Sequence, residues 1–208
     1  FSKVLKNGGS LYLFGKPDCI DFINYRPYLN LTSRIVWYQT SRLSQGKTKY
    51  TNNYDIIVHF TKGKTKAFNL DHIRVPQLVE LEHRKRCENV PSVVNGKFNK
   101  TKFNSNGKNP GDVWGDIKQL TYKSKELVSR ELLNTIQKPV KLIERIVKAS
   151  SNEGDTVLDP FAGVGTTFVV CKELKRNFIG FEINEDYVGI SNERARGIEL
   201  KQANKLFT

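Results

Sequence analysis

Short apolar runs alternate with polar segments along the first third of the chain, and this pattern predicts β-strands. β-branched and aromatic residues are concentrated at Ser10–Phe14, Ser33–Tyr38 and Tyr54–Phe60, and such runs are typical of strands. The polar segment 41–53 separates the last two runs, so we expect an antiparallel pair with a long basic connection. Residues 18–31 have apolar positions at helical spacing, interrupted by a proline.

The last third of the chain alternates helices and strands. Pro139 suits the first turn of a helix over Val140–Lys148, and a charged helix is expected at Glu185–Arg196. Between them, a strand that starts at Thr156 runs into a glycine turn and a further helix, and Phe178–Ile183 is a second apolar strand. The pattern predicts an α/β core.

The glycine turn at Gly163-Val164-Gly165 is the strongest candidate for a binding site. Two glycines remove side chains where the chain must bend and be approached closely, and the next helix begins with unpaired amide donors. Glu182 ends the second strand about 20 residues beyond the first, the spacing at which an acid meets ribose hydroxyls. We therefore expect a nucleoside-bearing cofactor; the alternative is an ordinary βαβ unit with a surface glutamate.

The middle of the chain differs from both ends. From about Leu70 to Asn134, Asn, Lys, Gly and isolated apolar residues replace the regular helix and strand patterns of the two ends. The segment is interpreted as an insertion with its own function, and the alternative is a poorly ordered surface excursion. The predicted division is 1–69 for the first part of the core, 70–134 for the insertion and 135–208 for the cofactor half.

Charge and composition narrow the class of protein. The net charge is +13 over 208 residues, which favours a polyanionic partner, nucleic acid first, although basicity also serves solubility. The cysteines Cys19, Cys87 and Cys171 are scattered and indicate neither a disulfide framework nor a zinc site. The scattered cysteines lead us to expect a cytoplasmic protein without a metal site. No apolar run approaches the roughly 18 residues of a membrane span, so we expect no membrane protein.

Three motifs in a fixed order carry a resemblance to a known family. Gln137-Lys138-Pro139, Asp159–Thr167 and Phe178–Glu182 resemble motifs of the S-adenosylmethionine-dependent amino-methyltransferases of DNA. More narrowly, the chain resembles their permuted beta class, in which the catalytic half and the target-recognition segment precede the cofactor half. The resemblance implies a Rossmann-like sheet, mostly parallel with an antiparallel strand pair, helices on both faces and an inserted target-recognition segment.

The resemblance also implies a function. These bacterial and phage enzymes methylate adenine N6 or cytosine N4 on a base flipped out of double-stranded DNA, and we favour adenine N6. The implied cofactor is S-adenosylmethionine. Implied partners are DNA, a second copy of the chain in a homodimer, and a cognate restriction endonuclease.

Site residues follow from the matching positions. The resemblance assigns to the cofactor site Lys138, Pro139, Asp159, Pro160, Phe161, Ala162, Gly163, Gly165, Thr166, Thr167 and Glu182. Asp159 would accept from the cofactor's amino group, and Glu182 from its ribose hydroxyls. The family usually has His-Pro-Thr before Gln-Lys-Pro, whereas this chain has Asn134-Thr135-Ile136, and Val164 stands where Ser is most common.

Other assignments concern DNA. Trp37 and Tyr38 occupy the place of an aromatic strand end beside the target base, and the alternative is that Trp37 is packed core with Tyr38 covering it. Trp114 is interpreted as an anchor of the recognition segment. The residues expected to touch phosphates are Lys47, Lys49, Arg84, Lys85 and Arg86.

One family motif is absent from this sequence. The family's Asp/Asn/Ser-Pro-Pro-aromatic motif supplies acceptors for the amine hydrogens, and the chain contains no Pro-Pro. Its strand would lie between the Leu11 and Val157 strands, so we expect a gap there. Residues 1–9 read as the last turns of a helix closed by Asn-Gly, and the chain has no Met. We therefore expect an upstream segment or a second chain to supply the motif, and no methylation by these residues alone.

Other functions fit less well or stay open. A DNA-binding subunit without catalysis would bind cofactor, if at all, with no methyl transfer. An RNA methyltransferase is allowed by the charge but less favoured by the motif order. An NAD-dependent oxidoreductase fits worse, because the turn lacks a third glycine at Gly-x-x-Gly spacing.

Overall fold

The computed structural model describes residues 1–16, 23–39, 47–48, 50–77, 91–94, 97–100, 104–128 and 137–197. The chain divides into two compact units, Phe1–Asn69 with Asp112–Thr208, and Leu70–Gly111. The second unit begins where the predicted insertion begins. It ends at Gly111, after which the chain returns to pair with a strand of the first unit.

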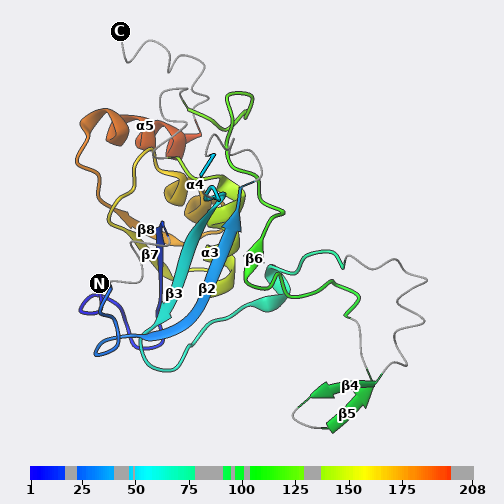
Figure 1. Cartoon of the computed structure of the whole chain (residues 1–208). Helices are drawn as coiled ribbons and strands as arrows, with labels where there is room; N and C mark the ends of the chain where they lie inside the picture. Colours follow the sequence, from blue (N-terminus) through cyan, green and yellow to red (C-terminus); the bar gives the residue numbers. More distant parts are fainter. Residues whose placement is uncertain are drawn as a thin grey trace. The chain divides into compact units, whose positions relative to one another are not determined.

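The first unit contains a four-stranded sheet of order β1-β3-β2-β6 (Figure 1). Its strands are β1 (Ser10–Gly15), β2 (Asn30–Tyr38), β3 (Tyr54–Thr61) and β6 (Val113–Trp114). β3 is antiparallel to both β1 and β2, and β6 is parallel to β2. Three strands therefore run one way and β3 runs the other, which confirms the predicted antiparallel pair in an otherwise parallel sheet.

A second, parallel sheet carries the cofactor motifs. It consists of β7 (Thr156–Asp159) and β8 (Asn177–Gly180), with Val157 opposite Phe178 and Leu158 opposite Ile179. Among the described strands, none pairs with the remaining edge of β1 or with the remaining edge of β7. These are the two strand edges between which a further strand is expected.

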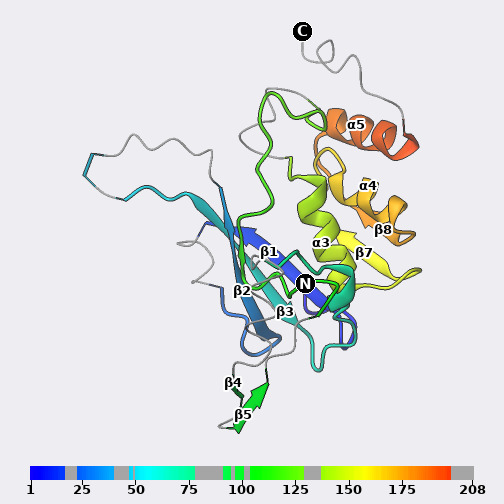
Figure 2. The ribbon, with the colours of Figure 1, turned by 90° about the vertical axis from the view of Figure 1, so that its right-hand side faces the viewer.

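Helix α3 (Val140–Ser150) packs against both sheets, and Figure 2 shows it beside them. Leu142 and Ile146 share one stripe of the helix and join the buried cluster of the four-stranded sheet. Ile143 and Val147 form the neighbouring stripe and pack with Val157 of β7. Spacings of four residues place each pair on one face, so a single helix fills two cores.

Two further helices follow the strands of the second sheet. They are α4 (Thr166–Glu173) and α5 (Glu185–Arg196), the latter with the predicted bounds. The rings of Phe168 in α4 and Phe178 in β8 stack with centroids 4.8 Å apart. Phe178 lies opposite Val157, which packs against α3, so α4 and α3 cover the same face of the second sheet. On the opposite face, Leu158 and Ile179 are exposed.

The opposite face of the four-stranded sheet is covered by irregular chain. Tyr25 and Leu29 pack on Val58 and Phe60, and the Tyr25 and Phe60 rings lie 4.8 Å apart. Helices on both faces stay a prediction; within residues 23–29, which pack on this face, the structure has a turn at 26–28. The chain start is not an α-helix: it forms turns in which Val4 and Leu5 donate to the Phe1 carbonyl.

The second unit contains little regular structure in its described part. It has a short 3-10 helix, η1 (Leu70–His72), and a hairpin of β4 (Pro91–Val94) and β5 (Lys97–Lys100). Arg74 ties the unit together by donating to the Asp71 carboxylate at 2.6 Å and to the Gly107 carbonyl at 3.0 Å. None of the described helices is long and apolar enough to cross a membrane.

Candidate cofactor-binding site

The glycine turn lies between the end of β7 and the start of α4. Gly163 and Gly165 both adopt left-handed backbone, with φ of 53° and 77°, which favours glycine. A Cβ on Gly165 would lie 2.1 Å from Ser191 Oγ and 3.0 Å from Ser191 Cα. The second glycine is therefore required by the close approach of α5 as well as by the bend.

Asp159 connects the end of β7 to both sides of the turn. Its Oδ1 accepts from the Phe161 amide at 3.1 Å, and its Oδ2 accepts from Thr167 Oγ1 at 2.6 Å. A carboxylate has about four acceptor positions. Asp159 thus braces the turn and keeps acceptor capacity for a ligand.

Glu182 makes a second connection, from the end of β8. Its Oε2 accepts from the Gly163 amide at 2.8 Å, and its Oε1 accepts from the Ile183 and Asn184 amides at 2.9 Å each. The sequence predicted bare backbone at Gly163, but this amide faces a carboxylate, and Gly163 is buried. About one acceptor position of Glu182 is left for a ligand.

Apolar side chains flank the two carboxylates. Phe161 is 79% exposed and Ile183 is 97% exposed. The Ala162 amide donates to the Phe181 carbonyl at 2.9 Å, so the segments that carry the two side chains are adjacent. Ile183 was not predicted as a site residue; its signal in the sequence is an apolar residue placed directly after the acid at a strand end.

The side chain of Gln137 ties the Gln137-Lys138-Pro139 motif to the backbone of residues 126–128. This side chain accepts from the Val128 amide at 3.0 Å and donates to the Glu126 carbonyl at 2.5 Å, while the Glu126 carboxylate accepts from the Val140 amide at 2.9 Å. The last contact stabilises the amino-terminal end of α3. Glu126 was not predicted as a site residue, because it belongs to no recognisable motif.

Lys138 reaches toward the four-stranded sheet. Its Nζ lies 5.7 Å from the centre of the Phe14 ring and 5.9 Å from that of Trp37, within the range of cation–π attraction. Pro139 precedes the first helical residue of α3, and its carbonyl accepts from the Leu142 amide. Thr135 and Ile136 lie outside the described residues.

Trp37 is packed core, which is the alternative that the sequence left open for it. Only 3% of it is exposed, and its Nε1 donates to the Ile117 carbonyl at 2.7 Å. The side chain alternates inward in β2, where α3 covers the sheet. Tyr38, the next residue, points the other way and is 39% exposed, so it alone stays a candidate for stacking on a base.

Trp114 is buried, as an anchor would be. The Arg145 guanidinium lies 4.9 Å from the centre of its indole and donates to both Asp116 oxygens, at 3.0 and 2.5 Å. These bonds hold the pKa of Asp116 below its usual range. The contacts fix residues 112–117 on α3.

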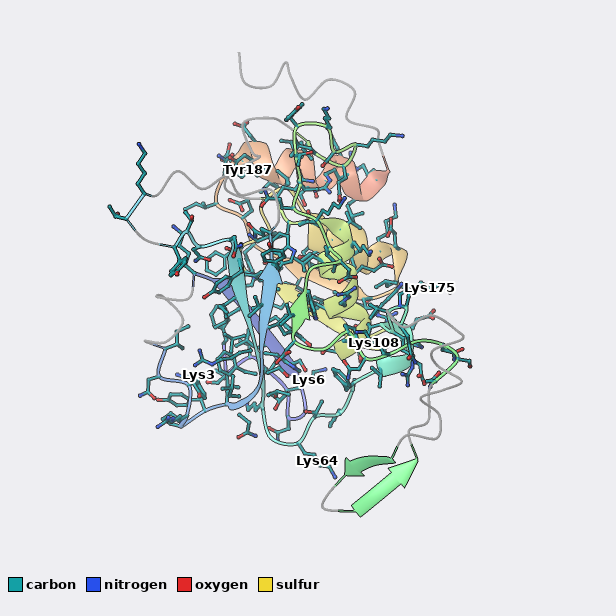
Figure 3. All side chains as sticks on the ribbon, turned by 45° about the vertical axis from the view of Figure 1, so that its right-hand side comes forward. Lys3, Lys6, Lys64, Lys108, Lys175 and Tyr187 are labelled. Carbon is teal, nitrogen blue, oxygen red and sulfur yellow. The ribbon has the colours of Figure 1, made fainter. Side chains whose placement is uncertain are left out.

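Basic side chains are spread over the first unit. Lys3, Lys6, Lys64 and Lys175, labelled in Figure 3, are exposed. Lys47 is also exposed. The other residues expected at phosphates, Lys49, Arg84, Lys85 and Arg86, lie outside the described residues.

Comparison with known proteins places the chain among DNA methyltransferases. Residues 1–193 match the family described as DNA methylase, N6_N4_Mtase. The type II methyltransferase M.HpaI of Haemophilus parainfluenzae is 38% identical over 92% of this chain and 55% of its own length. M1.MboII of Moraxella bovis is 35% identical over 94% of this chain and 75% of its own length. The DNA adenine methyltransferase YhdJ of Escherichia coli is 36% identical over 92% of this chain and 62% of its own length.

Solved structures agree in fold. The cytosine-N4-specific PvuII DNA methyltransferase matches with a TM-score of 0.63 at 17% identity, over 98% of this chain and 73% of its own. The M1.HpyAVI–SAM complex matches with a TM-score of 0.57 at 19% identity, over 93% of this chain and 77% of its own. The predicted α/β methyltransferase fold is confirmed, although the chain spans only 55–75% of the curated relatives named above. The chain belongs to the N6/N4 DNA methylase family.

Proposed function

We propose that this chain is the cofactor-binding and DNA-recognising part of a site-specific DNA amino-methyltransferase. The observation that carries the proposal is the pair of carboxylates, Asp159 and Glu182, held on either side of the glycine turn with acceptor capacity left over. The motif order and the family membership support it. The cofactor is S-adenosylmethionine, which supplies an activated methyl group when bound.

The residues around the turn fit that cofactor by their chemistry. Asp159 accepts from its amino group and Glu182 from a ribose hydroxyl, each with acceptor positions that the protein leaves unused. Phe161 and Ile183 offer exposed apolar surface for the adenine ring. The first N–H groups of α4, at Thr166 and Thr167, have no acceptor within the helix and attract the carboxylate of the cofactor's methionine portion.

The acceptor is an exocyclic amine of a flipped base, with adenine N6 favoured because one relative is named a DNA adenine methyltransferase. Tyr38 stacks on the base. The groups that orient the amine come from a strand that fills the gap between β1 and β7, supplied by a further segment of the protein or by another chain. Within the part of the chain that the structure describes, one edge of β1 and one edge of β7 have no paired strand, which supports this step.

The second unit reads the DNA sequence, and exposed lysines such as Lys47 contact phosphates. The protein works in the bacterial cytoplasm on double-stranded DNA. A cognate restriction endonuclease belongs to the same proposal, because M.HpaI and M1.MboII are named type II methyltransferases. A homodimer is proposed on the family resemblance alone.

Tritiated methyl transfer tests the proposal. S-adenosylmethionine labelled in the methyl group is incubated with unmethylated bacterial DNA and either this chain or the chain extended by its natural upstream sequence. We expect label on DNA from the extended form alone, and digestion to nucleosides identifies the base. No label from either form, with cofactor binding intact, would favour a binding subunit without catalysis; label on RNA alone would favour an RNA methyltransferase.

A further inference from the structure

Helix α5 presents a buried surface to the glycine turn. The Asn184 side chain accepts from the Asp186 and Tyr187 amides and so starts the helix directly after Glu182. One helical turn further, Ile190 packs against Val164, and Ser191 meets Gly165. The same face carries a charged residue, Arg194.

Arg194 reaches from the last turn of α5 into the glycine turn. Its Nη1 donates to the Val164 carbonyl at 2.5 Å and lies 3.4 Å from Thr166 Oγ1. Val164 and Thr166 are both buried. Burial lowers the pKa of Arg194, while the Glu126 carboxylate opposes this shift, and an arginine stays charged at neutral pH.

The Val164 carbonyl is the acceptor at the centre of the glycine turn. It lies between two glycines with left-handed backbone, which have more conformational freedom than other residues. Asp159 fixes the turn at Phe161 and Thr167, and Glu182 fixes it at Gly163. Arg194 supplies the third connection, a charge-assisted hydrogen bond from the side of the helix.

We propose that Arg194 is a positioning residue for cofactor binding, which holds the Gly163–Gly165 turn in the conformation that receives the cofactor. This rests on the proposed function of the turn. Arg194 acts through Val164 and Thr166, which distinguishes it from the two carboxylates that contact the ligand. A turn that reaches the binding conformation only part of the time binds its ligand more weakly by that fraction.

The test compares three variants of the same protein. Arg194→Met keeps the length of the side chain and removes the donors, and Arg194→Lys restores one donor. Arg196→Met is the matched control, since it removes the same charge from an exposed position two residues away. S-adenosylmethionine affinity is measured by titration calorimetry, and amide exchange at Gly163, Val164 and Gly165 is measured without cofactor.

We expect Arg194→Met to weaken cofactor binding by about tenfold, the usual effect of losing one hydrogen bond to a charged group. Amide exchange in the turn should accelerate, Arg194→Lys should recover part of both, and Arg196→Met should match the wild type. Equal affinities and equal exchange rates in Arg194→Met and Arg196→Met would overturn the proposal. If the wild type binds no cofactor, the proposed function fails, and the exchange rates still decide whether Arg194 orders the turn.

Discussion

Replacing Gly165 with alanine tests the claim that the turn is shaped by contact with α5. The added Cβ meets two separate obstacles. The backbone has φ of 77°, which an L-residue adopts at a cost, and the new carbon would lie 2.1 Å from Ser191 Oγ, 2.8 Å from its Cβ and 3.0 Å from its Cα. The last atom belongs to the backbone of α5, so rotating the serine side chain does not remove the overlap.

The magnitude follows from the two obstacles. Left-handed backbone costs a non-glycine residue about 1–2 kcal/mol, and inserting a carbon into a filled site costs about 1–3 kcal/mol more. Gly165→Ala should therefore lower the free energy of unfolding by about 2–5 kcal/mol. Gly154→Ala is the matched control, because φ is 81° there and the new Cβ would meet nothing within 4 Å; it should show the backbone cost alone.

Urea denaturation of the cofactor-free protein measures both variants against the wild type. A third variant, Gly165→Ala with Ser191→Gly, removes two of the three clashing atoms and should recover part of the loss relative to Ser191→Gly alone. The reasoning would be refuted if Gly165→Ala were no less stable than Gly154→Ala. It would also fail if the Ser191 change gave no recovery, because the clash would then not be the cause.

Three further outcomes are expected. Burial lowers the pKa of His59 to about 4. As the pH falls below about 6.5 the unfolded state binds a proton that the folded state does not, so the wild type should lose about 3 kcal/mol of unfolding free energy by pH 4. His59→Gln should flatten the dependence of unfolding free energy on pH over this range. The hydrogen bonds from Arg145 lower the pKa of Asp116, so its carboxylate stabilises the fold above its ordinary pKa of about 4. This contribution is lost as the pH falls through the folded-state pKa, so the difference in urea midpoint between wild type and Asp116→Asn should be largest at pH 7 and shrink in acid. In the methyl-transfer assay, Tyr38→Ala should reduce kcat/KM about ten- to a hundredfold, the effect of losing one base–aromatic stack, with the Kd for S-adenosylmethionine unchanged; unchanged kcat/KM would remove Tyr38 from the base site.

Local patterns in the sequence predicted the main elements of the core well. Strands at β1, β2 and β3 and helices α3 and α5 follow directly from hydrophobic spacing and from a proline at the start of α3. Residues 18–31 have helical spacing with an interruption at Pro27, and in the described part, 23–29, Tyr25 and Leu29 pack on β3 from irregular chain around a turn at 26–28. Spacing alone cannot distinguish these two ways of covering a sheet.

The site was predicted in position but not in its contacts. Asp159, the glycine turn and Glu182 come together as expected, whereas the three amides held by Glu182 depend on the path of the chain after β8. The family resemblance left two places open for Trp37, beside the target base or in the core, because the sequence predicts its strand but not which face of the sheet its side chain occupies. Glu126 and Arg194 have no motif, and their contacts arise only when distant segments pack.

Calorimetric titration of this chain with S-adenosylmethionine tests the central claim, that Asp159, the glycine turn and Glu182 form its binding site. We predict saturable one-to-one binding and no heat with NAD. Glu182→Gln should bind about tenfold more weakly, because its amide cannot accept in both places where the carboxylate does. Glu185→Gln, an exposed change of the same charge in the first turn of α5, should bind like the wild type. A cooperatively folded wild type without binding heat, or equal affinities in the two variants, would contradict the account.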